Sequence, residues 1–159
     1  MINNKTRAQI VGFFGNKILI MKRSEFNPVQ SGKWDFGEYI INGETPFTIQ
    51  LQDSIKKNLD VGCEILYDCN ENAIPVATYT MQHERPDPYR DGPSHSGIVF
   101  GADLFSENIK FKVKTYSEYK FVTIEELLAM DNSEFSFGTL KDVAITAMAR
   151  LQISTVSYF

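Results

Sequence analysis

Long apolar runs, runs of like charge and low-complexity stretches are all absent from this sequence of 159 residues. Because a bilayer-spanning helix needs about 20 mainly apolar residues in succession, we expect no membrane segment and no signal peptide. Hydrophobic residues still make up 43% of the chain, which is long enough to bury one sizeable core. We therefore expect a single domain over residues 1–159, located in the cytoplasm.

Cysteine and excess positive charge are also scarce. Cys63 and Cys69 are too few for a disulfide framework and lack the paired spacing of a zinc site, so we expect reduced thiols. The 16 Lys and Arg residues are outnumbered by 20 Asp and Glu residues, and the net charge is -4. Extended nucleic-acid binding is therefore disfavoured. A pocket for a small phosphorylated ligand remains open, because it needs only a few local cations.

The first part of the chain has the pattern of a β-hairpin. Residues 8–14 and 17–22 are rich in Ile, Val, Phe and Leu, and Gly15-Asn16 between them suits a tight turn. A polar stretch follows and leads to the apolar residues 39–41, which predict a short strand.

A helix is predicted to begin at Pro46, because a proline has no N–H to leave unpaired at the first helical position. The Thr45 hydroxyl is expected to cap it. Three apolar side chains then fall four apart on one side of the helix, namely Leu51, Ile55 and Leu59.

The second part of the chain alternates strands with turns and ends in helices. Strands are predicted at 63–67, 74–81, 97–104, 109–114 and 119–122. Thr123 and Glu126 form a capping box that opens a short helix, and a last helix is predicted over 139–152. Helices on both sides of a mixed central sheet define an α/β fold, an α/β/α sandwich.

Three of these segments resemble the Nudix hydrolase family. They are Lys33-Trp34-Asp35-Phe36, the helix opening Gly43-Glu44-Thr45-Pro46, and the late segment 118–127. The resemblance implies a Nudix-like sandwich that cleaves a nucleoside diphosphate linked to another group. It also implies Mg²⁺ or Mn²⁺, held by glutamates on the helix, as the cofactor.

The family's box reads Gly, five residues, Glu, seven residues, Arg-Glu, an apolar residue, any residue, Glu-Glu, any residue, Gly. If the alignment is anchored on Gly43-Glu44-Thr45-Pro46, Glu44 is the first glutamate and Glu38 stands at the first glycine. Gln52-Asp53 then replaces Arg-Glu, and Lys56-Lys57 replaces the paired glutamates. In this register Asp53 is the one helix position that keeps a carboxylate.

A second register is anchored on Trp34, or back from Leu59-Asp60-Val61, and shifts the helix by one residue. It places Ile55 at the apolar position, Asp53-Ser54 at Arg-Glu and Lys57-Asn58 at the paired glutamates. In either register an ammonium group stands where a cation would bind and repels it. Asp53 and Lys57, four apart, are expected to form an ion pair in place of the metal cluster.

Residues 82–96 form a stretch that is long for a loop in a compact domain. In the family, an acid or base from a loop outside the box can complete the site, so Glu84, Asp87 and Asp91 are alternative candidates for a ligand or base, with Glu84 as the candidate catalytic residue. Arg85 and Arg90 offer planar guanidinium groups for phosphate. The alternative is a solvated loop whose opposite charges pair with each other.

We weigh three hypotheses for function. The first is a binding or regulatory protein for a nucleoside diphosphate-linked molecule, with metal-dependent hydrolysis weakened or lost, no resident metal, and ligand contacts from Lys56, Lys57, Arg85 and Arg90. The second is an active, divergent Mg²⁺- or Mn²⁺-dependent pyrophosphohydrolase with Glu44, Asp53 and Glu84 as catalytic residues, of which Glu44 and Asp53 hold metal. The third is a protein-interaction module. The resemblance also implies a homodimer.

Overall fold

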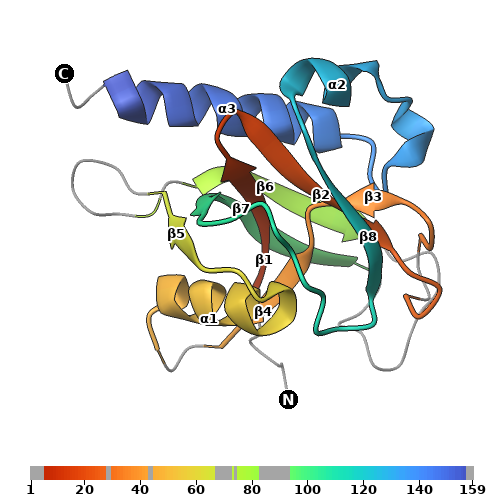
Figure 1. Ribbon diagram of the computed structural model, residues 1–159, viewed down its shortest axis with the longest axis horizontal. Helices are drawn as coiled ribbons and strands as arrows, with labels where there is room; N and C mark the ends of the chain where they lie inside the picture. The colour runs from red at the N-terminus through yellow and green to blue at the C-terminus, as the bar shows by residue number, and fades with distance from the viewer. Residues whose placement is uncertain are drawn as a thin grey trace.

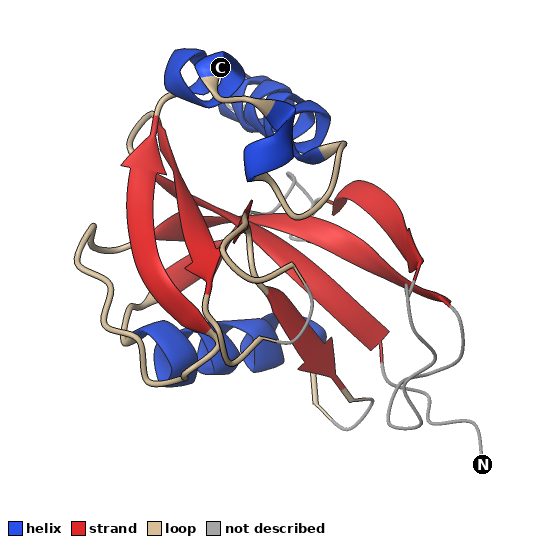
Figure 2. Ribbon diagram, turned by 90° about the vertical axis from the view of Figure 1, so that its right-hand side faces the viewer, coloured by secondary structure: helices blue, strands red, loops and turns tan. Residues whose placement is uncertain are grey.

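The computed structural model describes residues 6–27, 30–42, 45–66, 73, 75–82 and 94–156. One mixed sheet lies between helix α1 on one face and helices α2 and α3 on the other (Figures 1 and 2). The strands are β1 (Thr6–Phe14), β2 (Lys17–Arg23), β3 (Trp34–Asp35), β4 (Glu38–Ile41), β5 (Cys63–Ile65), β6 (Pro75–Gln82), β7 (Ser94–Leu104) and β8 (Tyr116–Val122). The helices are α1 (Phe47–Leu59), α2 (Ile124–Ala129), the 3-10 helix η1 (Asn132–Glu134) and α3 (Leu140–Val156). The predicted α/β/α sandwich is confirmed.

The sheet has the strand order β3-β2-β1-β7-β5, with β4 beside β1, β6 beside β7 and β8 beside β2. Strands β1 and β7 run parallel and the other described pairs are antiparallel, which confirms the mixed sheet. The predicted hairpin is present, with Phe14 opposite Lys17. Gly15 turns the chain with a φ of 62°, a conformation that glycine adopts without steric cost.

Alternate side chains of the sheet fill two cores. On β1, Ala8 and Ile10 point toward α1, whereas Val11 and Phe13 point toward α3. The core under α1 contains the predicted helix positions, all of them buried: Leu51, Ile55 and Leu59. Burying an aliphatic side chain of this size contributes about 1.5–3 kcal/mol, so this face positions the helix on the sheet.

The start of α1 differs from the prediction. The helix begins at Phe47, Pro46 is its N-cap, and no side chain caps it, so the predicted Thr45 cap is wrong. The Gln50 side chain ties the incoming chain to the helix instead. Its Nε2 donates to the Asn42 and Thr45 carbonyl oxygens, each at 2.7 Å, and its Oε1 accepts from Asn42 N at 2.9 Å.

The strand predicted at 109–114 is wrong. This segment caps the end of α1: Lys110 N donates to Leu59 O at 3.0 Å, and Lys112 N donates to Asn58 O at 2.8 Å. The last carbonyl groups of a helix have no partner within the helix, so they can bind a neighbouring chain segment. The apolar pattern of the segment reflects packing of Ile109 and Phe111 on the core under α1.

The other helices agree with the sequence. Thr123 Oγ1 accepts from Glu126 N at 3.2 Å, which confirms the capping contact that opens α2. The last helix extends to Val156, beyond the predicted 152. Cys63 is a buried free thiol, as predicted, and Cys69 lies outside the described residues. Among the helices that the structure describes, none is long and apolar enough to cross a membrane.

Candidate functional site

The geometry of α1 distinguishes the two registers of the box. The box needs an apolar residue packed inward, and Ile55 is 1% exposed whereas Ser54 is only half-buried. The box ends in glycine, which suits the left-handed conformation after a helix, and Asp60 adopts that conformation with φ 54° and ψ 37°. Both features fit the second register. In that register the helix glutamates are replaced by Ser54, Lys57 and Asn58.

Asp53, Lys56 and Lys57 are all exposed on α1. Lys56 Nζ lies 3.3 Å from Asp60 Oδ1. The predicted ion pair between Asp53 and Lys57 is wrong, since the structure describes both residues and no salt bridge joins them. The Lys57 ammonium group is therefore not paired with the Asp53 carboxylate, which lies one helical turn before it.

Four predicted site residues lie outside the described part of the chain: Glu44, Glu84, Arg85 and Arg90. Within the described part, no three Asp, Glu, His or Cys side chains are grouped so as to hold a metal ion. Mg²⁺ and Mn²⁺ need clustered oxygen ligands. The described residues of α1, with a lysine and two neutral side chains at the glutamate positions, do not fit such an ion.

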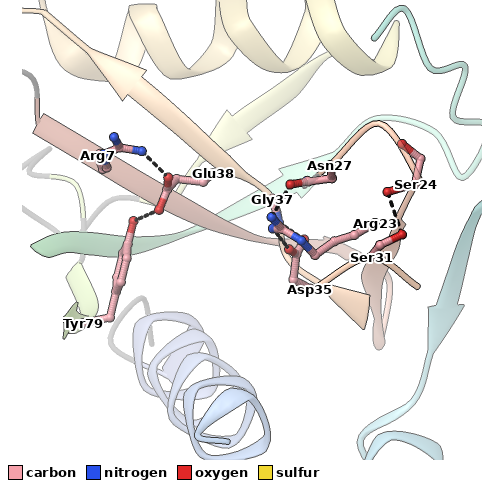
Figure 3. A network of polar contacts seen from close by, with 9 residues as sticks. All are labelled: Arg7, Arg23, Ser24, Asn27, Ser31, Asp35, Gly37, Glu38 and Tyr79. Carbon is pink, nitrogen blue, oxygen red and sulfur yellow. Dashed lines mark hydrogen bonds and ion pairs between the residues drawn. The ribbon is translucent and has the colours of Figure 1, made fainter. Parts of the chain in front are cut away.

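A buried polar cluster lies on the α1 face of the sheet, where β2, β3 and β4 meet (Figure 3). Arg23 Nη1 donates to Asp35 Oδ2 at 2.7 Å, and Gly37 N donates to Asp35 Oδ1 at 2.9 Å. The Tyr116 side chain also acts to lower the pKa of this carboxylate. Burial raises the pKa of Asp35, which is 4% exposed, above its ordinary value, and the charge of Arg23 opposes that shift. The cluster therefore holds an ionisable acid and a cation side by side in the interior.

Two tyrosines complete this cluster. Burial is the main cause that raises the pKa of Tyr39 and of Tyr116 well above the usual tyrosine range, so both remain protonated donors. Gly37 has a φ of 87°, and a Cβ there would lie 2.6 Å from Met21 Cε. Glycine thus lets the backbone pass directly over these side chains. Residue spacing does not predict this cluster; the one signal in the sequence is Asp35, an acid between the apolar residues Trp34 and Phe36.

A second polar cluster occupies the opposite face of the sheet (Figure 3). Glu38 Oε1 accepts from Arg7 Nη1 at 2.7 Å, and Glu38 Oε2 accepts from the Tyr79 hydroxyl at 2.8 Å. Gly97 makes room for the tyrosine, because a Cβ there would lie 2.5 Å from its hydroxyl oxygen. Glu38 begins β4 and lies opposite Gln9 of β1, and its side chain points to the face away from α1. Its carboxylate therefore does not converge with Asp53, which lies on α1.

Comparison with known proteins identifies the fold. No protein-family model matches the sequence, and no curated protein matches it. A Nudix-family hydrolase from Clostridium perfringens superposes with a TM-score of 0.71 at 12% identity, over 94% of this chain and 99% of its own. An ADP-ribose pyrophosphatase from Streptococcus suis gives 0.58 at 11% identity over 93% and 92%. A UDP-X diphosphatase gives 0.62 at 9% identity over 95% and 66%. The chain has the fold of the Nudix hydrolases.

Proposed function

We propose that this protein binds a nucleoside diphosphate-linked small molecule and that its metal-dependent hydrolysis is weakened or lost. The observation that carries the proposal is the surface of α1, where Ser54, Lys57 and Asn58 stand at the glutamate positions of the second register. The class of ligand is suggested by the structural neighbours, one described as an ADP-ribose pyrophosphatase and one as a UDP-X diphosphatase.

In this proposal Lys57 neutralises phosphate charge, which a metal ion does in the family. An exposed ammonium group attracts a diphosphate directly and neutralises its charge without a bridging cation. Lys56 contributes less, because its charge is shared with Asp60 at 3.3 Å. Arg85 and Arg90 would add bidentate contacts to the phosphate oxygens. The role is then binding or regulatory rather than catalytic.

The rival, an active divergent hydrolase, would gather metal ligands from Glu44, Asp53 and Glu84, with Glu38 as a fourth acid. Glu38 is bound to Arg7 and Tyr79 on the sheet face opposite α1. Moving it to Asp53 would break a salt bridge and a charge-assisted hydrogen bond. No described contact favours this rival or a role as a protein-interaction module.

The test is calorimetric titration of ADP-ribose and of UDP-glucose in the presence of EDTA. The wild type should bind at least one of them without metal. Lys57→Gln should weaken that binding by about tenfold to a hundredfold, since a charge-assisted hydrogen bond contributes about 1.5–3 kcal/mol. Lys56→Gln should weaken it less, and the exposed β2 variant Lys17→Gln is the matched control that should leave it unchanged.

Two results would overturn the proposal. One is binding that appears only when Mg²⁺ or Mn²⁺ is added and is followed by turnover of the ligand. The other is metal-free binding that Lys57→Gln, Lys56→Gln and Lys17→Gln leave equally unchanged, because the surface of α1 would then not contact the ligand.

A further inference from the structure

A hollow of about 440 Å³ lies beside the C-terminal end of α1. Its walls come from three segments, namely the last turn of α1, the turn into β5 and the chain that follows β7. The chain after β7 crosses the end of the helix (Figure 1), where Lys110 N donates to Leu59 O at 3.0 Å. Backbone hydrogen bonds therefore hold the walls of the hollow together.

The hollow lies on a different side of α1 from the glutamate positions of the box. Successive residues of an α-helix are about 100° apart around its axis. Lys56, which lines the hollow, is therefore about 160° from both Ser54 and Asn58. A ligand in the hollow would thus not occupy the surface on which the family binds metal.

The polar groups that line the hollow are mainly hydrogen-bond donors. Lys56 and Lys110 contribute two ammonium groups against one carboxylate, that of Asp60. Lys56 Nζ lies 3.3 Å from Asp60 Oδ1 and has further N–H groups to donate, and Lys110 forms no salt bridge with a described residue. Ser106 Oγ accepts from Asn108 N at 3.0 Å, which leaves its hydroxyl hydrogen free to donate. This set of donors fits an oxyanion, which only accepts hydrogen bonds.

The carbonyl groups at the end of α1 would repel an anion if they were unpaired. They are bonded to backbone N–H groups instead. Lys56 O accepts from Asp60 N at 3.0 Å, and Asn58 O accepts from Lys112 N at 2.8 Å. The charge facing the hollow is therefore set mainly by its side chains.

An exposed aromatic ring forms the remaining wall. Phe105 is 67% exposed, more than any other large hydrophobic side chain that the structure describes. Its N donates to Gly62 O at 2.9 Å, and a Cβ at Gly62 would lie 2.8 Å from Phe105 Cδ2. The ring is thus held against the glycine backbone while most of its surface faces solvent. Stacking of a flat ring on Phe105 would bury this apolar surface.

We propose that this hollow is a second ligand site, which binds a small phosphate monoester that carries a flat apolar ring. The phosphate lies between Lys56 and Lys110 with the Ser106 hydroxyl as a further donor, and the ring stacks on Phe105. A phosphate monoester carries about two negative charges at neutral pH, which matches two ammonium groups. The site goes beyond the diphosphate binding proposed for Lys57. Because Lys56 is shared with that proposal, Lys110 and Lys57 are the variants that separate the two sites.

The test is an NMR titration of the isotope-labelled full chain with phenyl phosphate and, separately, with AMP, both in EDTA. At least one should bind saturably and shift the amide signals of Gly62, Phe105 and Asn108. The tighter of the two identifies the ring as a simple aryl group or a nucleobase. Lys110→Gln should weaken binding by about tenfold or more, because it removes a charge-assisted hydrogen bond. Phe105→Leu should reduce the affinity for phenyl phosphate to that for inorganic phosphate, because leucine has no flat face.

Lys112→Gln is the matched control, since Lys112 is an exposed lysine two residues from Lys110 that does not line the hollow. Lys112→Gln and Lys57→Gln should leave phenyl phosphate binding unchanged, and Lys110→Gln should leave ADP-ribose binding unchanged. Circular dichroism checks that each variant is folded.

Three results would overturn the inference. Neither probe binds saturably, or Lys110→Gln and Lys112→Gln have equal effects on binding. The third is binding of both probes that Lys57→Gln removes and Lys110→Gln does not, which would place them at the surface of α1 and leave the proposed function standing.

Discussion

The Arg23–Asp35 pair joins the end of β2 to β3. The two side chains are 16% and 5% exposed and lie 2.7 Å apart. Taking two charges out of water costs free energy that only close pairing and further hydrogen bonds offset. Gly37 N provides a further hydrogen bond to Asp35. The pair therefore fixes local geometry more than it adds stability.

Arg23→Met should lower the free energy of unfolding by about 3–5 kcal/mol, because Asp35 would remain buried without its cation. The double variant Arg23→Met/Asp35→Leu should recover most of that loss. Urea unfolding of the wild type, both single variants and the double variant measures the coupling. Independent, additive losses would show that the two charges do not depend on each other.

The raised pKa of Asp35 gives stability a specific pH dependence. Its folded pKa lies above the ordinary value of 3.8, so the folded state retains the proton longer than the unfolded state. Its contribution is present below pH 3.8 and is lost as pH rises through the folded pKa. The wild type should therefore lose unfolding free energy relative to Asp35→Asn as pH increases over that range. Unfolding curves of both proteins at a series of pH values provide the test, and a wild type that gains unfolding free energy relative to Asp35→Asn as pH rises would contradict it.

These buried residues could not be predicted as a site from the sequence. Arg23 and Asp35 lie at the two ends of the polar segment that connects β2 to β3. Tyr116 begins β8, which is far away in the sequence. Such contacts depend on the packing of β2, β3 and β8, which residue spacing does not specify. The candidates on α1 were accessible from the sequence because a helix has a fixed period.

At the scale of elements, the sequence predicted helices and turns correctly where their contacts join residues close together in the chain. The Gly15-Asn16 hairpin, the apolar side of α1 and the Thr123 cap all depend on residues a few positions apart. The segment 109–114 was misassigned because its backbone bonds to the end of α1, about fifty residues earlier in the chain. Residue spacing leaves both registers of the box open, and the burial of Ile55 and the conformation of Asp60 fit the second.

Thr123→Ala should destabilise the protein by about 1 kcal/mol, because the hydroxyl satisfies an otherwise unpaired N–H at the start of α2. Thr123→Ser keeps the hydroxyl and should cost much less. Thermal unfolding of the two variants gives the comparison. Equal losses in both would indicate that the methyl group, and not the cap, is what matters.

Restoring the glutamates should reveal the register of α1 directly. The triple variant S54E/K57E/N58E supplies three carboxylates at the positions of the second register and should gain saturable Mn²⁺ binding. The variant K56E/K57E restores the paired glutamates of the first register and should bind Mn²⁺ more weakly. Calorimetry on both folded variants separates the registers, and stronger binding by K56E/K57E would reverse our assignment.

At the scale of the whole molecule, a Nudix fold is retained while α1 presents cations and neutral side chains to the solvent. The fold depends on the two cores, and these need no metal ligand. Fold and metal chemistry can therefore separate: sequence changes at exposed Lys57 and at half-buried Ser54 and Asn58 alter the surface of α1 without disturbing the buried residues that hold it.

The measurement that tests this account most directly is calorimetric titration of Mn²⁺ and Mg²⁺ into the wild type and Asp53→Ala, with and without ADP-ribose. We predict no saturable metal binding that depends on Asp53, because one exposed carboxylate beside Lys57 is a poor ligand set for a hard cation. Tight metal binding in the wild type that Asp53→Ala abolishes, together with turnover of the ligand, would contradict the account and identify the protein as an active hydrolase.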